Sequence, residues 1–168
     1  MRAIEWAVGF PERVERAVII SVGAKATAEE IALCSVQMRA IRLDPKWNGG
    51  DYYGGPGPVR GLAIARMIGH ITYLSDAAMR RKFGRQLHAR NTPGFSFDTD
   101  FQVESYLDYQ GKSFVGRFDA NSYLYLTRVM DYFDPVGDVA PVIERLRGSR
   151  TRFLVLSFDT DWRFPTEH

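Results

Sequence analysis

The chain has 168 residues and a formal net charge of +2, with 45% hydrophobic and 25% charged side chains. This balance is typical of a globular protein and excludes a disordered tail or a collagen-like repeat. No apolar run reaches the roughly 20 residues that a membrane-spanning helix needs, so no membrane segment is predicted. The single cysteine, Cys34, excludes an internal disulfide framework and favours a reducing, cytoplasmic location.

The first part of the chain is predicted to hold a strand between two helices. A short helix extends to about Gly9, and the β-branched apolar run at 17–22 predicts a strand buried on both faces, as in a parallel sheet. Thr27 and Glu30 have the spacing of a capping box, in which each side chain bonds the other residue's backbone N–H. The next helix should therefore extend from about residue 28 to residue 43.

The rest of the chain alternates between helices and loops until a second strand near its end. The Gly- and Pro-rich segment 48–58 and the polar stretch 88–98 are predicted to be loops. Asp138 is placed to cap a helix that ends at Gly148. The apolar run 152–158 predicts a second buried strand. Additional helices are predicted, in chain order, at 60–74, 75–84, 101–109, 112–117 and 121–132.

Two strands cannot form a stable parallel sheet by themselves, because such sheets need several strands with both faces covered. Either the protein is mostly helical with two unusual strands, or these residues are an excerpt of a larger α/β protein. The pattern of elements favours the second interpretation.

The helix at 61–73 is apolar nearly all round, which predicts burial, and it carries one polar stripe. Arg66, His70 and Tyr73 are spaced i, i+4 and i+7, so they share one face. Because an unpaired buried arginine is costly, this stripe should line a wet cavity, where the guanidinium fork suits a carboxylate. Alternatively, Arg66 forms a buried ion pair with a nearby aspartate and His70 is a satisfied core histidine. Helix geometry alone leaves both interpretations open.

An acidic turn follows the second predicted strand. Asp159 and Asp161 come just after the C-terminal end of that strand, where open α/β sheets place ligands and catalytic groups. In α/β-hydrolases, the acid that orients the catalytic histidine occupies such a turn. Taken alone, the pattern is better explained by a helix cap or an Asx-turn.

Motifs of several other function classes are absent. No Gly-x-Ser-x-Gly elbow occurs, and no Gly-rich loop precedes a helix with a phosphate-binding lysine. His70, His88 and His168 show no zinc-ligand spacing with Cys34, so no metal site is predicted. Cys34 lies among apolar residues and is interpreted as a packing residue. No groove-reading motif accompanies the basic cluster at 80–85, so nucleic-acid binding is not predicted.

Several long segments carry a family resemblance. The most specific is Arg60-Gly-Leu-Ala-Ile-Ala-Arg-Met-Ile-Gly-His-Ile-Thr-Tyr-Leu-Ser75, and others lie at 101–110, 117–127, 131–134 and 157–162. In content and order these segments resemble the homoserine O-acetyltransferases of methionine biosynthesis. The resemblance extends over nearly the whole chain.

This resemblance implies an α/β-hydrolase fold with an inserted, mostly helical lid. Residues 1–25 would form one part of the hydrolase core, 26–135 the lid, and 136–168 a second part of the core with the acid turn. The two predicted strands would be parallel core strands. The resemblance also implies a homodimer formed through the helical lid.

The resemblance assigns roles to three residues. Asp161 corresponds to the triad acid, with Asp159 as its neighbour out of register. Arg66 and Tyr73 correspond to residues that hold homoserine, and Arg66 takes its carboxylate. No bound cofactor is implied. Acetyl-CoA is the co-substrate of a ping-pong acyl transfer through a serine.

The family's nucleophile and catalytic histidine have no counterpart in these residues. Met1 begins a stretch that resembles the residues just after the family's Gly-Gly-Ser-Met-Gly-Gly elbow. His168 follows Asp161 within the local turn, whereas the family's histidine comes from a later loop. We therefore expect the chain alone to be inactive. The alternatives are the related homoserine O-succinyltransferase and a non-catalytic lid fragment that dimerises or pairs with a separate polypeptide.

Overall fold

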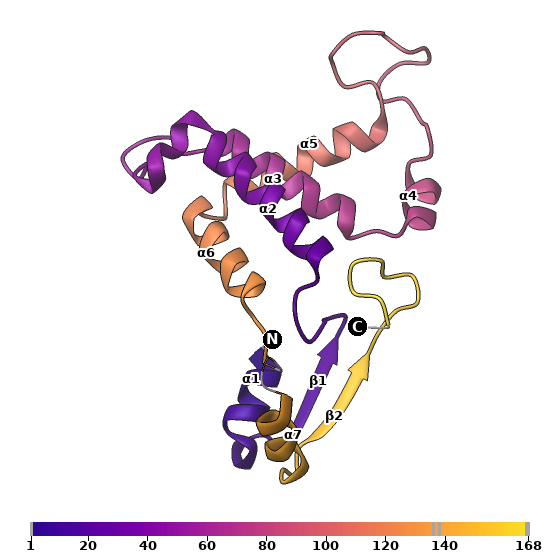
Figure 1. The fold of residues 1–168 in the computed structure, drawn as a ribbon. Coiled ribbons are helices and arrows are strands. Elements are labelled where there is room, and N and C mark those ends of the chain that lie inside the picture. The colour runs from indigo at the N-terminus through magenta and orange to yellow at the C-terminus, as the bar shows by residue number, and fades with distance from the viewer. Residues whose placement is uncertain (1, 136, 138, 167–168) are drawn as a thin grey trace. The chain divides into compact units, whose positions relative to one another are not determined.

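The structure is a computed structural model that describes residues 2–135, 137 and 139–166. Asp138 and His168, to which two of the sequence predictions refer, lie outside the described residues. The described chain is mixed α/β, with two strands among many helices (Figure 1). In chain order the elements are α1 (Arg2–Gly9), the 3₁₀ turn η1 (Pro11–Arg13), β1 (Arg16–Ile20), α2 (Ala28–Leu43), the 3₁₀ turn η2 (Pro45–Gly50), α3 (Val59–Thr72), α4 (Asp76–Lys82), α5 (Gln102–Val115), α6 (Ala120–Asp131), α7 (Val139–Arg147) and β2 (Arg152–Leu156).

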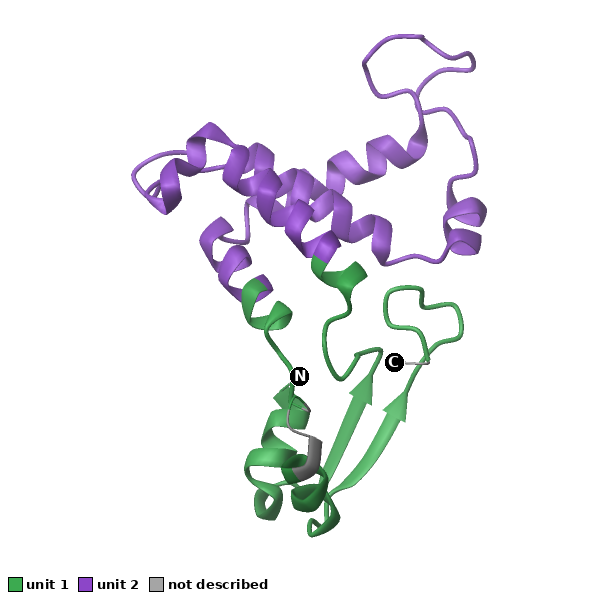
Figure 2. Cartoon of the chain, viewed as in Figure 1, with its two compact units in different colours: residues 1–31, 128–168 green, residues 32–127 purple. Residues whose placement is uncertain are grey.

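The chain divides into two compact units, which Figure 2 shows in separate colours. Unit 1 consists of Met1–Ile31 and Arg128–His168, and it contains both strands. Unit 2 consists of Ala32–Thr127 and is helical. The division into core, lid and core at residues 25 and 135 stays a prediction.

Unit 1 is built around the parallel pair of strands. Arg16 lies opposite Arg152 and Ile20 opposite Leu156 in the ladder. The Ser21 N–H extends the ladder by donating to the Leu156 carbonyl at 2.9 Å. Helix α1 packs against β1 and against α7 (Figure 1). The predicted strands are therefore confirmed, and so is their parallel pairing.

The prediction that both strands are buried is wrong for the described structure. Ala17 is the one buried residue of β1, and every residue of β2 is exposed. A parallel strand is buried by neighbouring strands and by helices on both faces of the sheet. The sheet of the described residues has two strands only. Apolar, β-branched composition indicates that a strand favours burial, but it cannot show whether the covering elements are present.

The core of unit 2 lies where α2, α3, α5 and α6 meet. Its buried members come from all four helices: Ile41, Leu62, Ala65, Phe114 and Ala120. Gly61 allows α3 to lie directly against α2, because a Cβ at this position would overlap the carbonyl oxygen of Ala40. Two helix backbones approach this closely only where a glycine leaves room.

Helix α5 is continuous, so the prediction of two separate helical pieces at 101–109 and 112–117 is wrong. Gly111 lies inside the helix and is buried. A Cβ on Gly111 would lie 3.0 Å from the carbonyl oxygen of Ala63 in α3. The glycine therefore permits close packing of α5 on α3 and does not mark a helix break.

The predicted start of α2 is confirmed together with its capping box. The Thr27 N–H donates to Glu30 Oε2 at 2.7 Å, and the Glu30 N–H donates to Thr27 Oγ1 at 3.3 Å. The helix ends at Leu43, as the sequence predicted. Among the described residues, no helix is both long and apolar enough to cross a bilayer.

Candidate functional site

Helix α3 carries the polar stripe, and Asp44 fixes where this helix starts. Asp44 Oδ2 accepts from the Gly61 N–H, and Oδ1 accepts from the Lys46 N–H, both at 3.0 Å. Burial alone would raise the pKa of Asp44, but its backbone N–H donors outweigh burial and lower it below its usual value. The sequence analysis missed this cap, because Asp44 lies 17 residues before the N–H that it caps.

The structure brings Arg66 and Tyr73 into contact. Arg66 Nη1 donates to Tyr73 Oη at 3.0 Å. The guanidinium carbon lies 4.6 Å from the centroid of the Phe114 ring and 5.4 Å from that of Tyr73. Stacking on two aromatic rings suits the flat, weakly hydrated guanidinium group and restricts its orientation. The predicted shared face is confirmed.

The charge of Arg66 is not neutralised by a carboxylate in the described part of the chain. No ion pair of Arg66 with an aspartate or glutamate is found there. Its Nε atom is buried and has no hydrogen-bond partner among the described residues. The alternative in which Arg66 forms a buried ion pair with a nearby aspartate is therefore not what the described structure shows.

His70 occupies the middle of the stripe and is 8% exposed. Its Nδ1 lies 2.9 Å from Tyr106 Oη of α5, whereas Nε2 is buried without a partner among the described residues. Burial lowers the pKa of His70 below its usual value of 6.5. The positive charges of Arg66, Lys82 and Arg117 lower it further. His70 is therefore a neutral imidazole at neutral pH, and only half of its hydrogen-bonding capacity is satisfied.

Gln37 of α2 is a site residue that the sequence analysis missed. It is buried, and its Oε1 accepts from Tyr123 Oη at 3.0 Å. A Cβ on Gly69 would lie 3.5 Å from Tyr73 Oη and 3.7 Å from Gln37 Nε2, so the amide and the hydroxyl flank the same glycine. A signal was present in the sequence, because Gln37 is a polar residue on the helix face that also carries the buried Cys34 and Ile41.

The prediction that α3 is buried nearly all round is only partly right. Leu62 and Ala65 are buried, but Ile64 is 48% exposed and Ile71 is 46% exposed. Apolar residues on every face favour burial, yet α2 and α5 cover only part of this helix in unit 2.

Asp161 lies in unit 1, in the turn that follows β2. Its Oδ1 accepts from the Arg163 N–H at 3.0 Å and from the Phe164 N–H at 2.9 Å. Asp159, two residues earlier, is exposed. These bonds are the local pattern of an Asx-turn, which was the simpler of the two sequence interpretations. They also restrict the orientation of the carboxylate, and the triad role of Asp161 stays a prediction.

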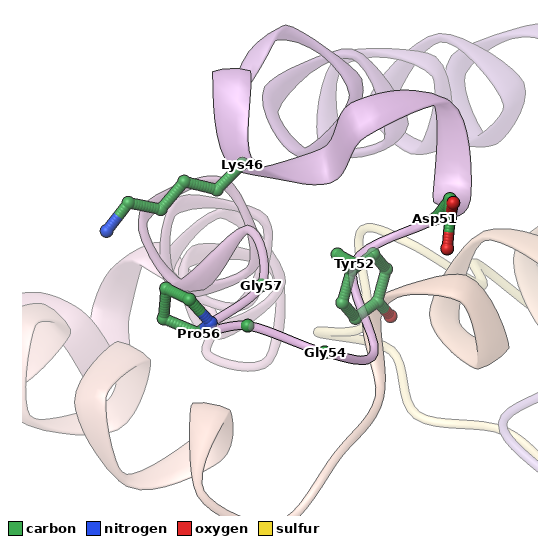
Figure 3. Close-up of a pocket in the computed structure, with 7 residues that line it drawn as sticks. Lys46, Asp51, Tyr52, Gly54, Pro56 and Gly57 are labelled. Atoms are coloured by element: carbon green, nitrogen blue, oxygen red, sulfur yellow. The ribbon is translucent and has the colours of Figure 1, made fainter.

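A pocket of about 350 Å³ opens beside η2 (Figure 3). Its lining contains none of Arg66, Tyr73 and Asp161. The residues that line it are Lys46, Asp51, Tyr52, Gly54, Gly55, Pro56 and Gly57. Among the described residues no group of three or more histidine, cysteine, aspartate or glutamate side chains is placed to hold a metal ion.

One wall of this pocket, Tyr52, is fixed by a polar network. The Tyr52 hydroxyl donates to the Asp119 carboxylate and accepts from the Asn121 N–H at 3.0 Å. Asn121 in turn donates from Nδ2 to the Gly50 carbonyl at 2.8 Å and accepts from Trp47 Nε1 at 3.0 Å. Burial and the hydrogen bond to Asp119 raise the pKa of Tyr52 to about 12. This network connects the loop before α3 to the start of α6.

The chain has sequence relatives among curated proteins, although no protein-family model matches it. The chain is 56% identical to the homoserine O-acetyltransferase of Rhodopseudomonas palustris, over 99% of this chain and 42% of that protein. This chain is a homologue of the homoserine O-acetyltransferases. A protein of Magnetococcus marinus named homoserine O-succinyltransferase is 53% identical to this chain, over 99% of the chain and 44% of that protein. This chain spans about two fifths of the length of these curated relatives.

Solved structures share the fold of this chain. The homoserine O-acetyltransferase of Bacillus anthracis superposes with a TM-score of 0.82 at 20% identity, over 98% of this chain and 44% of that one. An acetylester hydrolase of Corynebacterium glutamicum gives a TM-score of 0.74 at 23% identity, over 99% of this chain and 45% of that one. The predicted fold class is confirmed: the chain is part of an α/β-hydrolase fold, with two parallel core strands and an inserted, mostly helical region.

Proposed function

We propose that this chain supplies the homoserine-binding residues and the triad acid of a homoserine O-acetyltransferase. The reaction moves an acetyl group from acetyl-CoA to the side-chain hydroxyl of homoserine. The observation that carries the proposal is the state of Arg66. Its guanidinium contacts the rings of Phe114 and Tyr73, and no carboxylate of the described residues neutralises it.

In this proposal Arg66 binds the carboxylate of homoserine. An arginine fork and a carboxylate form two parallel charge-assisted hydrogen bonds, which fix the orientation of the amino acid as well as its position. The buried Arg66 Nε, which lacks a partner among the described residues, would gain an acceptor. Tyr73 keeps its hydroxyl 3.0 Å from Arg66 Nη1, so it is placed to bond the same ligand.

Asp161 takes the role of the acid that orients a catalytic histidine. Such an acid holds the imidazole in the correct tautomer and stabilises the imidazolium that forms, without itself becoming protonated. The backbone N–H groups of Arg163 and Phe164 hold one carboxylate oxygen of Asp161. In this role, the other carboxylate oxygen, Oδ2, accepts a hydrogen bond from the catalytic histidine.

The acyl transfer proceeds in two steps in this proposal. A serine outside the 168 residues attacks the thioester carbonyl of acetyl-CoA, and its proton passes through the histidine to the leaving thiolate, which releases CoA. The homoserine hydroxyl then attacks the acetyl-serine ester, gives its proton to the histidine, and leaves as O-acetylhomoserine. The histidine passes this proton to the serine oxygen as the bond between the acetyl group and the serine breaks, and the serine is regenerated. No metal or bound cofactor takes part, and the site residues of this chain bind and orient.

Further parts of the proposal concern assembly and place. The helical region at 26–135 forms a homodimer contact, and the reaction belongs to methionine biosynthesis in the cytoplasm. The single, buried Cys34 agrees with a reducing compartment.

A second candidate is the use of succinyl-CoA as donor. The relative of Magnetococcus marinus that carries the O-succinyltransferase name is nearly as similar as the O-acetyltransferase of Rhodopseudomonas palustris. The two candidates share the homoserine site and differ only in the acyl chain that the donor pocket accepts.

A chimera tests both candidates. This chain replaces the matching stretch of the Rhodopseudomonas palustris relative, and transfer to homoserine is measured with acetyl-CoA and with succinyl-CoA. We expect acetyl transfer that falls on the order of a hundredfold in kcat/KM for Arg66→Met, because a charged hydrogen-bonding partner of the substrate is lost. Asp161→Asn should lower kcat by roughly 10⁴-fold, as removal of a triad acid does in other enzymes.

Two matched variants serve as controls in the chimera. Arg60→Met removes an exposed arginine from the same helix as Arg66, and Asp159→Asn removes the exposed neighbour of Asp161. Both should keep at least about half of the activity, since surface substitutions have small effects. Equal activity of Arg66→Met and Arg60→Met would contradict the homoserine site. A folded but inactive chimera, with the chain itself dimeric in solution, would favour the non-catalytic lid fragment.

A further inference from the structure

His70 lies between Arg66 and Tyr73 in the polar stripe, and its ring contacts Tyr73. Its ring is edge-on to the Tyr73 ring, with centroids 5.0 Å apart and an interplanar angle of 62°. It is also edge-on to the ring of Tyr106 in α5, at 5.7 Å and 85°. His70 thus joins the stripe on α3 to a neighbouring helix.

We propose that His70 and Tyr106 are positioning residues that hold Tyr73, and through Tyr73 the guanidinium of Arg66, in the geometry that receives the substrate carboxylate. This inference rests on the proposed function, because it gives a purpose to Arg66 and Tyr73 as a homoserine site. Neither His70 nor Tyr106 needs to touch the substrate.

The contacts form one connected series. Tyr106 Oη bonds His70 Nδ1 at 2.9 Å, the His70 ring packs against Tyr73, and Tyr73 Oη accepts from Arg66 at 3.0 Å. Tyr73 itself is 57% exposed. An exposed tyrosine has several rotamers available, and fixing one side chain in a single rotamer costs conformational entropy. Packing against the buried imidazole of His70 favours one of these Tyr73 rotamers.

Tyr106 is in turn held from its other side. Its ring packs against Phe83 with centroids 5.0 Å apart, and Lys82 Nζ lies 4.5 Å above it. Both neighbours belong to the end of α4. The support for Tyr73 therefore comes from α4 and α5, which a sequence pattern on α3 could not show.

The imidazole acts in its neutral form. The imidazolium form would carry a proton on both ring nitrogens, and the proton on the buried Nε2 would have no acceptor among the described residues. The charged groups that act on the ring are all cations, namely Arg66, Lys82 and Arg117, and the hydroxyl facing it is that of Tyr106. A neutral imidazole fixes Tyr73 without adding positive charge beside Arg66.

The test uses Tyr106→Phe in the chimera described above, with Tyr109→Phe as the matched control. Both variants remove one hydroxyl from α5, but Tyr109 is 67% exposed. L-Homoserine binding is measured by calorimetry, and the ring resonances of Tyr73 are followed by NMR in ¹³C-tyrosine-labelled protein. Tyr106→Phe should weaken homoserine binding about fivefold, the effect of one hydrogen bond, and shift the Tyr73 resonances. Tyr109→Phe should change neither.

Two substitutions of His70 separate the ring from the hydrogen bond. His70→Phe keeps a ring beside Tyr73 and loses the bond to Tyr106, so it should match Tyr106→Phe. His70→Asn keeps a polar partner for Tyr106 at the place of Nδ1 and loses the ring, so it should still move the Tyr73 resonances. A merely structural role would lower the free energy of unfolding without moving homoserine affinity or the Tyr73 resonances.

The outcomes distinguish this inference from the proposed function. If Arg66→Met abolishes homoserine binding while Tyr106→Phe and both His70 variants behave as Tyr109→Phe, the positioning role is overturned and the proposed function stands. If the chimera binds no homoserine, or if Arg66→Met binds it as tightly as the unsubstituted chimera, the proposed function fails. The Tyr73 resonances then still decide whether His70 and Tyr106 position that ring. If Tyr106→Phe does not fold, the two His70 variants give the same decision.

Discussion

Single side chains in unit 2 connect segments that are far apart in the sequence. Tyr52 and Asp119 are 67 residues apart, and Gln37 and Tyr123 are 86 residues apart. Such contacts cannot be predicted from local spacing, because no helix or strand period relates their members. The stripe on α3 could be predicted, since Arg66 and Tyr73 are seven residues apart, which is about two turns of one helix.

Within this network, loss of the Tyr52 hydroxyl should lower the free energy of unfolding most. Tyr52→Phe keeps the ring but leaves the Asp119 carboxylate and the Asn121 N–H each without a partner from Tyr52. We expect the free energy of unfolding to fall by about 1–3 kcal/mol, the cost of unsatisfied polar groups that are partly buried. Urea unfolding followed by circular dichroism measures this change. Tyr125→Phe, at a tyrosine that is 76% exposed, is the control and should change stability by less than about 0.5 kcal/mol.

The same tyrosine should make stability depend on alkaline pH. Its pKa is about 12 in the folded chain and 10.0 for an unperturbed tyrosine. The folded state therefore keeps a proton that the unfolded state has lost, so the contribution is complete below pH 10 and is lost as pH rises to about 12. Unfolding midpoints measured across this window should fall more steeply for the unsubstituted chain than for Tyr52→Phe. Parallel curves for the two proteins would show that Tyr52 does not titrate as described.

At the scale of elements, glycines at the contacts between helices determine how closely the helices of unit 2 pack. The limits of α2 were predicted correctly because its capping box and the following Asp44-Pro45 are local signals. The continuity of α5 was not predicted, because Gly111 lowers helix propensity and its reason for being there is contact with Ala63 in another helix. Helix ends are thus readable from the sequence, whereas a glycine inside a helix is ambiguous until its neighbour is known.

Gly61→Ala should separate α2 from α3. The new methyl group would overlap the Ala40 carbonyl oxygen and lie 2.7 Å from the Cα of Ile41, both of which are backbone atoms that cannot rotate away. We expect a loss of at least about 2 kcal/mol in the free energy of unfolding, as overpacking of a core costs about 1–3 kcal/mol. Gly116→Ala is the control, because a Cβ there meets no atom within 4 Å. If the two variants unfold at the same urea concentration, the close approach of α2 and α3 is not as described.

At the scale of the whole chain, the strands show where prediction from sequence reached its limit. Their positions and parallel pairing follow from apolar, β-branched runs, and both are present. Their burial depends on strands and helices beyond the pair. The curated relatives have more than twice the matched length, and the sheet of the described residues exposes apolar side chains such as Leu154 and Val155. An exposed apolar strand at a sheet edge is a site of association with other chains.

Val155→Lys tests whether this sheet controls self-association. Val155 is 64% exposed on β2, and a charge on an exposed strand opposes strand-to-strand association. Val129→Lys is the matched control: it makes the same substitution on α6, where the valine is 61% exposed. Both variants add the same charge, so a general effect of net charge should raise the solubility of both variants to the same extent. We expect light scattering at increasing protein concentration to fall at least about twofold for Val155→Lys and to stay nearly unchanged for Val129→Lys. Equal reductions would assign self-association to surfaces other than the sheet, and an opposite ranking would assign it to the exposed face of α6.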